Sequence, residues 1–186
     1  VRDAVLVTIS EGIGTGILAN GQLVTGKSGM AGEFGHMLFD QTGPRCACGA
    51  NGCWEMFASS RAALRYYKEF TSDRKQITIR GLLNLAKDEN TAAKNALIKQ
   101  AQYIGKGLRS IVTALAPELI LLVGDITSAW DLLSPFMVAE MTTLSLAASP
   151  PRLAPAYEGG EARLRGAAAL VLQSHSGHPT PRRLNG

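Results

Sequence analysis

The chain has 186 residues, 46% of them hydrophobic and 18% charged, and a net charge of +4. This size and apolar content fit one large domain with a buried core, while the lack of a long apolar run or a secretory signal argues against a membrane-spanning or exported protein. The basic residues are scattered and are not interleaved with aromatic residues, so they indicate a solvated surface, and we expect a cytoplasmic protein.

Antiparallel strands are predicted at the start of the chain. Residues 3–10 are rich in β-branched residues, which is typical of a buried strand. The glycines within residues 12–16 predict a tight turn. Asn20 and Gly21 then stand between two apolar runs, which is the strongest short signal for a hairpin. We therefore expect a three-stranded antiparallel meander.

A Gly-rich segment follows, residues 26–53, and a loop of this length inside a domain needs something to hold it. It contains all three cysteines of the chain, and an odd, clustered set does not fit a disulfide framework. Zinc takes four sulfur and nitrogen ligands in a structural site. We predict one structural zinc ion, Zn²⁺, bound by His36, Cys46, Cys48 and Cys53. The alternative, three free thiols in an exposed loop, would be open to oxidation.

Helical periodicity dominates the rest of the chain. Apolar residues at helical spacing predict helices over residues 54–70, 79–87 and 91–116. The apolar stripe of the last one fits either the core or a surface between subunits. Pro117 ends this helix, and a fully apolar strand is predicted over residues 119–123.

The C-terminal part is predicted to contain two more helices, over residues 130–141 and 163–173, the first with a kink at Pro135. Residues 174–186 have little to bury, so we expect them to be disordered. Strands followed by a helix–strand–helix pattern predict an α/β fold with a mixed sheet and helices on its faces.

The motifs around the cysteines are similar to those of a known family. Residues 32–36 read Gly-Glu-Phe-Gly-His, and residues 46–55 read Cys-x-Cys-Gly-x-x-Gly-Cys-x-Glu. The hairpin at residues 17–23 and the apolar strand with its flanks at 117–124 agree as well. Together they resemble the ROK family, which covers bacterial repressors, open-reading-frame proteins and sugar kinases. The resemblance extends over residues 3–173.

This resemblance implies a ribonuclease-H-like, actin-like ATPase fold of two lobes, with residues 1–173 as the C-terminal lobe of a longer protein. It implies the same zinc site and a small sugar, or sugar phosphate, bound by Glu33, His36 and Glu55. Carboxylates accept hydrogen bonds from sugar hydroxyls, and zinc binding fixes the other ring nitrogen of a histidine as a donor. Trp54 is expected to lie in the core and not to stack on the sugar.

The family divides into ATP-dependent sugar kinases and sugar-responsive transcription factors. Its kinases carry Gly-Thr-Gly at the first nucleotide turn and Gly-Gly at the second. This chain has Ser-Glu-Gly at residues 10–12 and an aspartate after Gly124. Glu11 and Asp125 would therefore repel ATP. We favour a sugar-sensing effector domain of a regulator of the N-acetylglucosamine-repressor or xylose-repressor type (NagC/XylR), although Gly14 and Gly16 leave an alternative phosphate loop open.

A regulator would bind DNA through a helix-turn-helix N-terminal to Val1, and we expect it to be a homodimer or homotetramer. The alternative is a sugar kinase of the glucokinase or N-acetylhexosamine kinase type, which would use ATP and Mg²⁺. The resemblance places the catalytic aspartate of such a kinase before the first strand, so no catalytic residue is assigned in this chain. A third interpretation is a carbohydrate-binding fragment without regulation.

Overall fold

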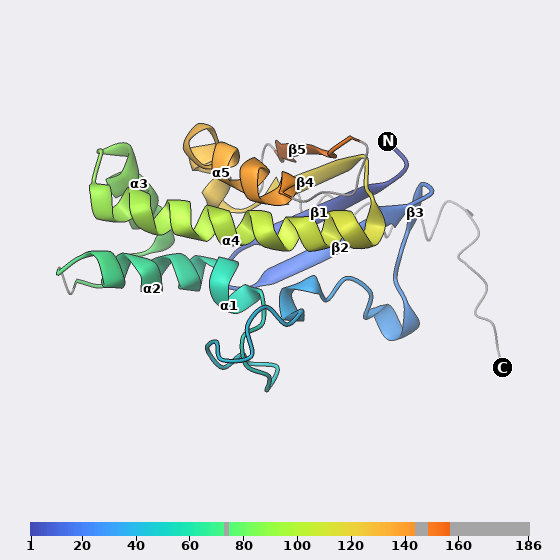
Figure 1. Cartoon of the computed structure of the whole chain (residues 1–186), viewed down its shortest axis with the longest axis horizontal. Helices are drawn as coiled ribbons and strands as arrows, with labels where there is room; N and C mark the ends of the chain where they lie inside the picture. Colours follow the sequence, from blue (N-terminus) through green and yellow to red (C-terminus); the bar gives the residue numbers. More distant parts are fainter. Residues whose placement is uncertain (73–74, 144–148, 157–186) are drawn as a thin grey trace, which may run out of the picture.

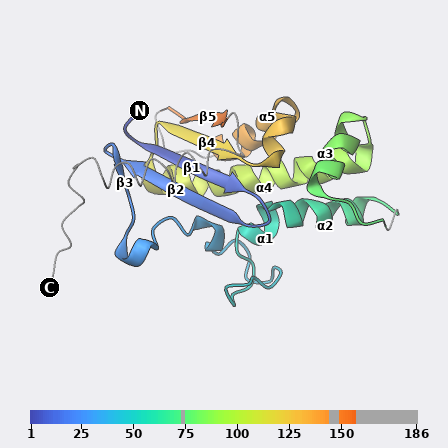
Figure 2. The ribbon, with the colours of Figure 1, turned by 180° about the vertical axis from the view of Figure 1, so that it is seen from behind.

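The structure, a computed structural model, describes residues 1–72, 75–143 and 149–156. Within these residues a five-stranded sheet has the order β3-β2-β1-β4-β5. The α-helices cover one face of this sheet and lie in front of it in Figure 1. In Figure 2, which shows the molecule from behind, the strands lie nearest the viewer. The strands are β1 (Ala4–Ile9), β2 (Ile13–Ala19), β3 (Gln22–Leu23), β4 (Leu119–Val123) and β5 (Arg152–Pro155).

The predicted antiparallel meander is confirmed. β1 pairs antiparallel with β2, and β2 pairs antiparallel with the short β3 across the hairpin. β4 joins the other side of β1 in parallel, with Val5 opposite Ile120. Because β1 is central and buried on its helix side, its alternate residues Val5, Val7 and Ile9 are at most 1% exposed.

The predicted glycine turn over residues 12–16 is wrong in its extent. The turn occupies only residues 10–12, and the chain is already a strand at Ile13. Gly14 pairs with Thr8, whose hydroxyl donates to the Gly14 carbonyl at 3.2 Å. Continuous pairing with β1 overrides the turn preference of the glycines. A phosphate loop at Gly14 and Gly16 is thereby replaced by pleated strand.

Three of the α-helices of the described residues begin at polar residues that cap them. Thr78 and Asn90 each accept a hydrogen bond from the backbone N–H three residues ahead, at 3.1 and 2.9 Å, as N-caps do. The predicted helix over 54–70 is broken at Ser59, whose extended backbone caps the second piece. The helices are α1 (Glu55–Ala58), α2 (Ser60–Phe70), α3 (Ile79–Lys87), α4 (Thr91–Leu115) and α5 (Trp130–Thr142), with short 3₁₀ turns η1 (Lys27–Gly29), η2 (Phe34–His36) and η3 (Asp125–Ala129).

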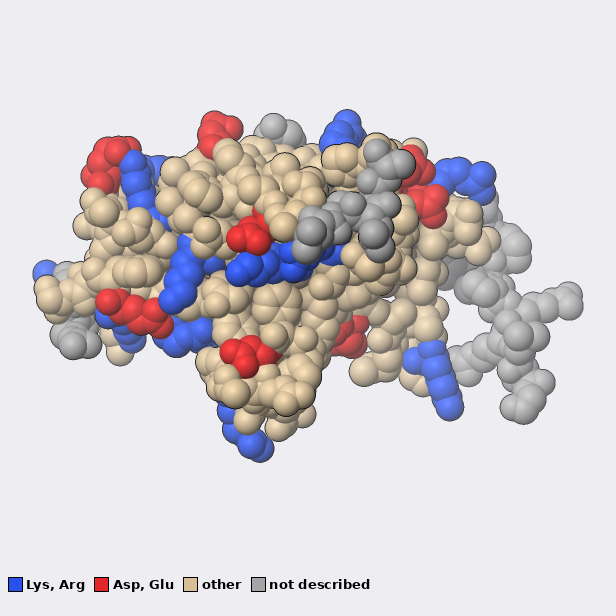
Figure 3. Space-filling view, viewed as in Figure 1, with Lys and Arg blue, Asp and Glu red and all other residues tan. Residues whose placement is uncertain are grey.

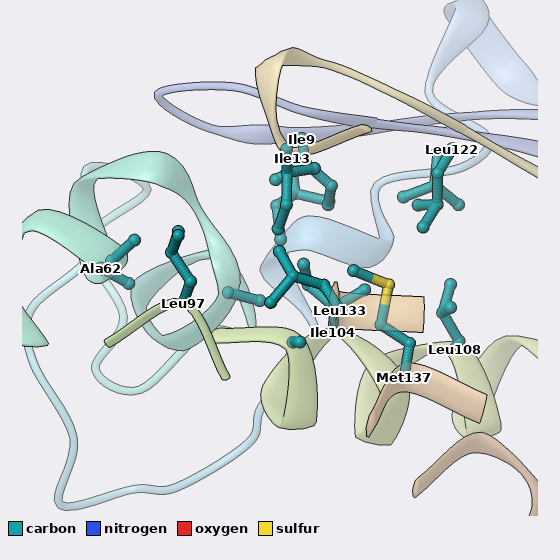
Figure 4. Packing of buried hydrophobic residues seen from close by; sticks show 14 of the residues in the cluster. Ile9, Ile13, Ala62, Leu97, Ile104, Leu108, Leu122, Leu133 and Met137 are labelled. Atoms are coloured by element: carbon teal, nitrogen blue, oxygen red, sulfur yellow. The ribbon is translucent and has the colours of Figure 1, made fainter. Parts of the chain in front are cut away.

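The long helix α4 supplies most of the core. Its predicted apolar stripe faces the sheet, α2 and α5, so the stripe belongs to the core and is not left for a subunit interface. Leu97, Ile104 and Leu108 are all fully buried there: Leu97 lies beside Ala62 of α2, and Ile104 and Leu108 lie close to Leu133 and Met137 of α5 (Figure 4). The helix ends as expected, with Ala116 in the left-handed region at φ 43° just before Pro117.

The edge strand β5 was not predicted. It lies parallel to β4 at the sheet edge, and Pro155 is tolerated there because an edge strand has unpaired N–H positions. The predicted helix 163–173 and the predicted disordered tail 174–186 lie outside the described residues. Among the helices of residues 1–72, 75–143 and 149–156, none combines the length and apolarity that a bilayer crossing requires.

Candidate functional site

The Cys-rich loop between β3 and α1 is a small folded unit that projects below the helix layer (Figures 1 and 3). The Cys46 N–H donates to the Ala50 carbonyl at 2.8 Å, and the Gly49 N–H donates back to the Cys46 carbonyl at 3.0 Å. Gly52 has φ 67°, and a Cβ there would collide with the Asp40 carbonyl, so only glycine fits. These backbone bonds turn the loop tightly enough to gather its side chains.

The structure brings together the four side chains that the sequence marked as metal ligands. One donor atom from each of them lies within 4.8 Å of the others, and the set consists of His36, Cys46, Cys48 and Cys53. Tetrahedral zinc with bonds of about 2.0–2.3 Å needs donor atoms roughly 3.3–3.8 Å apart. Two of the separations, from Cys46 Sγ to His36 Nδ1 and from Cys48 Sγ to Cys53 Sγ, are 3.5 Å and fall in this range. The donor set and its spacing therefore fit zinc.

Protonation of the thiols depends on their surroundings. Burial is the main cause that raises the pKa of the Cys53 thiol to about 12, and the neighbouring thiols of Cys48 and Cys46 raise it further. The Ala50 backbone N–H is the main cause that lowers the pKa of Cys48, which is exposed. Without a cation, Cys53 is therefore protonated at neutral pH, and a metal ion must displace that proton to bind.

His36 faces two ways. Its Nδ1 points to the thiol cluster, while its Nε2 lies 3.8 Å from Glu33 Oε2. Both side chains are accessible from outside, with 36% of His36 and 56% of Glu33 exposed. One ring nitrogen can thus hold a metal while the other, beside a carboxylate, faces a ligand.

Glu55 reaches the same neighbourhood from α1. Its Oε2 accepts the Ile13 N–H at 3.0 Å, and it lies so close to Gly12 that a Cβ there would be 2.5 Å from Oε2. Gly35 of η2 packs so tightly on the same Ile13 that a Cβ would collide with its carbonyl. The turn that carries Glu33 and His36 and the helix that carries Glu55 therefore meet at the first residue of β2. Sequence patterns contain no signal for the Ile13 contact, because a backbone N–H carries no residue type.

A hollow lies at the carboxyl ends of the parallel strands β1 and β4. It is a cavity of about 590 Å³, and Ser10, Arg80 and Asp125 are among its lining residues. Gly124, at φ 134°, brings the turn after β4 against the Ile9 carbonyl. Such crevices at the carboxyl ends of parallel strands are the usual ligand sites of open α/β sheets.

The two acidic residues at this edge are both paired. Glu11 lies 3.3 Å from Arg61, and Asp125 lies 3.4 Å from Arg80. Asp125 lines the cavity, and Glu11 is exposed in the turn beside it. Because each carboxylate has a cationic partner and contacts solvent, the repulsion of a phosphate is weaker than two unpaired carboxylates would produce.

The fold and the loop together define the class of protein. A mixed sheet with helices packed against it and a Cys/His loop after its first hairpin is of the actin-like ATPase type, the fold of the sugar kinases and transcriptional regulators of similar structure. The chain belongs to the ROK family, whose sequence profile matches residues 1–174.

The similar proteins include both branches of the family. The xylose repressor of Bacillus subtilis strain 168 is 33% identical over 170 residues, which are 90% of this chain and 44% of the repressor. A Streptomyces griseus glucokinase, solved with glucose and AMPPNP, superposes with a TM-score of 0.83 at 26% identity, over 91% of this chain and 60% of the kinase. A ROK family transcriptional regulator homologous to the MLC protein of E. coli superposes with a TM-score of 0.76 at 28% identity, over 83% of this chain and 42% of the regulator. The chain spans less than half the length of the xylose repressor.

Proposed function

We propose that residues 1–173 form the sugar-sensing C-terminal lobe of a ROK-type transcriptional regulator with a structural zinc ion. The observation that carries this proposal is that the turn carrying Glu33 and His36 and the helix carrying Glu55 both contact Ile13, and that His36 is also one of the four potential metal ligands. The rest of a longer protein would supply the other lobe and a DNA-binding helix-turn-helix, and the regulator would assemble as a homodimer or homotetramer.

The polar groups at this site suit a sugar. Two carboxylates and one imidazole offer acceptors and a donor at fixed positions, which is what neighbouring hydroxyls require. Glu55 already bonds Ile13 through Oε2, so Oε1 is the oxygen available to a hydroxyl. Glu33 and the outer nitrogen of His36 provide the second pair of contacts.

Zinc would act on this site through His36. With His36, Cys46, Cys48 and Cys53 as its four ligands, zinc would have no open position for a substrate, so the ion would be structural. When bound, zinc fixes the Nδ1 side of His36 and orders the Cys-rich loop. The free ring nitrogen then stays oriented toward Glu33 and the sugar.

The choice of a regulator rests on the two nucleotide turns. Side chains of Glu11 and Asp125 replace the glycines and hydroxyls that would cradle phosphates, and each is held by an arginine. The specific observation that favours the second candidate, a sugar kinase, is the 590 Å³ cavity beside Asp125, together with the high similarity to a glucokinase solved with AMPPNP. In that case ATP and Mg²⁺ would occupy this cavity.

Calorimetry of the intact protein separates these functions. Glucose, xylose, N-acetylglucosamine and N-acetylmannosamine are titrated with and without Mg²⁺-ATP, and ADP formation is followed in parallel. We expect one sugar to bind without ATP and no sugar-dependent ADP formation. Sugar-dependent ADP formation would establish the kinase instead.

Variants then test the residues. Glu33→Gln and Glu55→Gln should each weaken sugar binding about tenfold or more, because each removes a charge-assisted acceptor. Zinc content, measured by elemental analysis, should stay near one ion per chain in both. Asp88→Asn, an exposed acid at the end of α3, is the control and should change neither quantity. Unchanged sugar affinity in both glutamate variants contradicts the assignment of the pocket.

A further inference from the structure

Glu55 belongs to an unusually short helix, α1. α1 has only four residues, and a single helical turn is not stable alone in water. It is anchored at its start by Trp54, whose Nε1 donates to the Tyr103 carbonyl of α4 at 2.8 Å. The orientation of Glu55 therefore depends on what holds this turn from outside.

Side chains of α2 and α4 bind the carbonyls of α1 one after another. Arg65 Nη2 donates to the Met56 carbonyl at 2.6 Å, and the Tyr66 hydroxyl donates to the Phe57 carbonyl at 2.9 Å. Burial raises the pKa of Tyr66, so its hydroxyl stays protonated and available as a donor. Two carbonyls that lack partners inside so short a helix are thus satisfied from α2.

The last carbonyl of α1 receives its bond from the long helix. Gln100 Nε2 donates to the Ala58 carbonyl at 3.0 Å, and Gln100 is fully buried. The other amide atom, Oε1, is buried without a hydrogen-bond partner among the described residues. A buried acceptor without a partner costs free energy, and an apolar side chain of the same length would avoid that cost. The amide is therefore explained by the bond that it makes to α1.

We propose that Gln100, Tyr66 and Arg65 are positioning residues of the sugar site. They fix α1 through its carbonyls, so that Glu55 stays bonded to Ile13 and keeps its second oxygen aimed at a sugar hydroxyl. Gln100 carries the same constraint into α4, the central helix of the core. This inference rests on the proposed sugar site but concerns residues outside it.

The test exploits the buried oxygen of Gln100. Gln100→Met keeps the length of the side chain and removes both the donor and the orphan acceptor. We expect the thermal midpoint to change little, because the orphan oxygen of Gln100 is removed while the Ala58 carbonyl loses its donor, and the Kd for the sugar, titrated as xylose and glucose separately, to rise about fivefold or more. Gln102→Met, a half-exposed glutamine on the same helix, is the matched control and should change neither quantity. A merely structural role of Gln100 would lower the midpoint and leave the Kd near the wild-type value.

A second readout needs no sugar. The Ile13 N–H donates to Glu55 Oε2, so its hydrogen exchange should accelerate several-fold in Gln100→Met and in Tyr66→Phe, but not in Gln102→Met. Tyr66→Phe keeps the inference testable if the Gln100 variant does not fold. A wild-type protein that binds no sugar contradicts the proposed function, and Ile13 exchange then still decides whether Gln100 holds Glu55. Wild-type Kd and unchanged Ile13 exchange in both variants overturn the inference.

Discussion

Replacement of Gly107 by alanine tests the packing that holds the site against α4. Gly107 lies within α4, and a Cβ at this position would fall inside the indole of Trp54. Trp54 is fully buried and donates its Nε1–H to the Tyr103 carbonyl, so a movement of the ring would break this bond inside the core. The substitution must displace either the ring or the helix.

The magnitude is the sum of three contributions. Overpacking a well-filled core costs about 1–3 kcal/mol. A displaced indole leaves a buried donor unsatisfied, which costs about 1–3 kcal/mol more. The better helix propensity of alanine offsets about 1 kcal/mol. We therefore expect Gly107→Ala to lower the free energy of unfolding by roughly 1–5 kcal/mol.

Gly81→Ala is the matched control. In α3 the nearest atoms to a Cβ at Gly81 are 3.5 and 3.7 Å away, which is ordinary contact, so only the propensity gain of about 1 kcal/mol remains. Denaturant unfolding of the two variants and the wild type gives the comparison, with zinc content measured in each. If the Gly107→Ala protein has the same free energy of unfolding as the Gly81→Ala protein, the described contact between Trp54 and α4 is refuted.

Three further outcomes are expected. Because the pKa of Cys53 is about 12, zinc binding must release the proton of this thiol. Zinc affinity, measured by competition with a chelator, should therefore rise at least about tenfold per pH unit between pH 6 and 8. An affinity that does not change with pH would exclude Cys53 as a ligand. The double change Glu11→Gln and Asp125→Asn removes the ion-pair partners of two arginines near the cavity, so calorimetry should show that ATP binds several-fold tighter. Equal ATP affinity would mean that these two carboxylates do not weaken ATP binding. Asn90→Ala removes the N-cap of α4 and should cost about 1 kcal/mol in urea unfolding, whereas a neutral effect would contradict the capping bond to the Ala93 N–H.

Much of the fold could be predicted because its signals are local. The apolar run of β4, the hairpin at Asn20 and the long stripe of α4 each lie within a short window, where periodicity and turn chemistry act directly. The four potential metal ligands were also found from local spacing. They lie within eighteen residues, so the loop can bring them together without help from the rest of the chain.

The features that were missed depend on contacts distant in sequence. The strand character of Gly14 comes from pairing with β1, and the edge strand β5 exists only because β4 offers a free side. The break at Ser59 appears once α1 and α2 pack separately on α4. The hydrogen bonds between Ile13 and Glu55 and between Gln100 and Ala58 each join residues 42 positions apart, so no pattern within a short window reveals them.

Cys53, Trp54 and Glu55 are adjacent in the chain, yet each points to a different place. One reaches the thiol cluster, the next enters the core, and the third meets the start of β2. Each residue added to a helical segment rotates the side chains beyond it by about 100°. A single inserted or deleted residue at this triplet would therefore put the carboxylate or the thiol out of alignment.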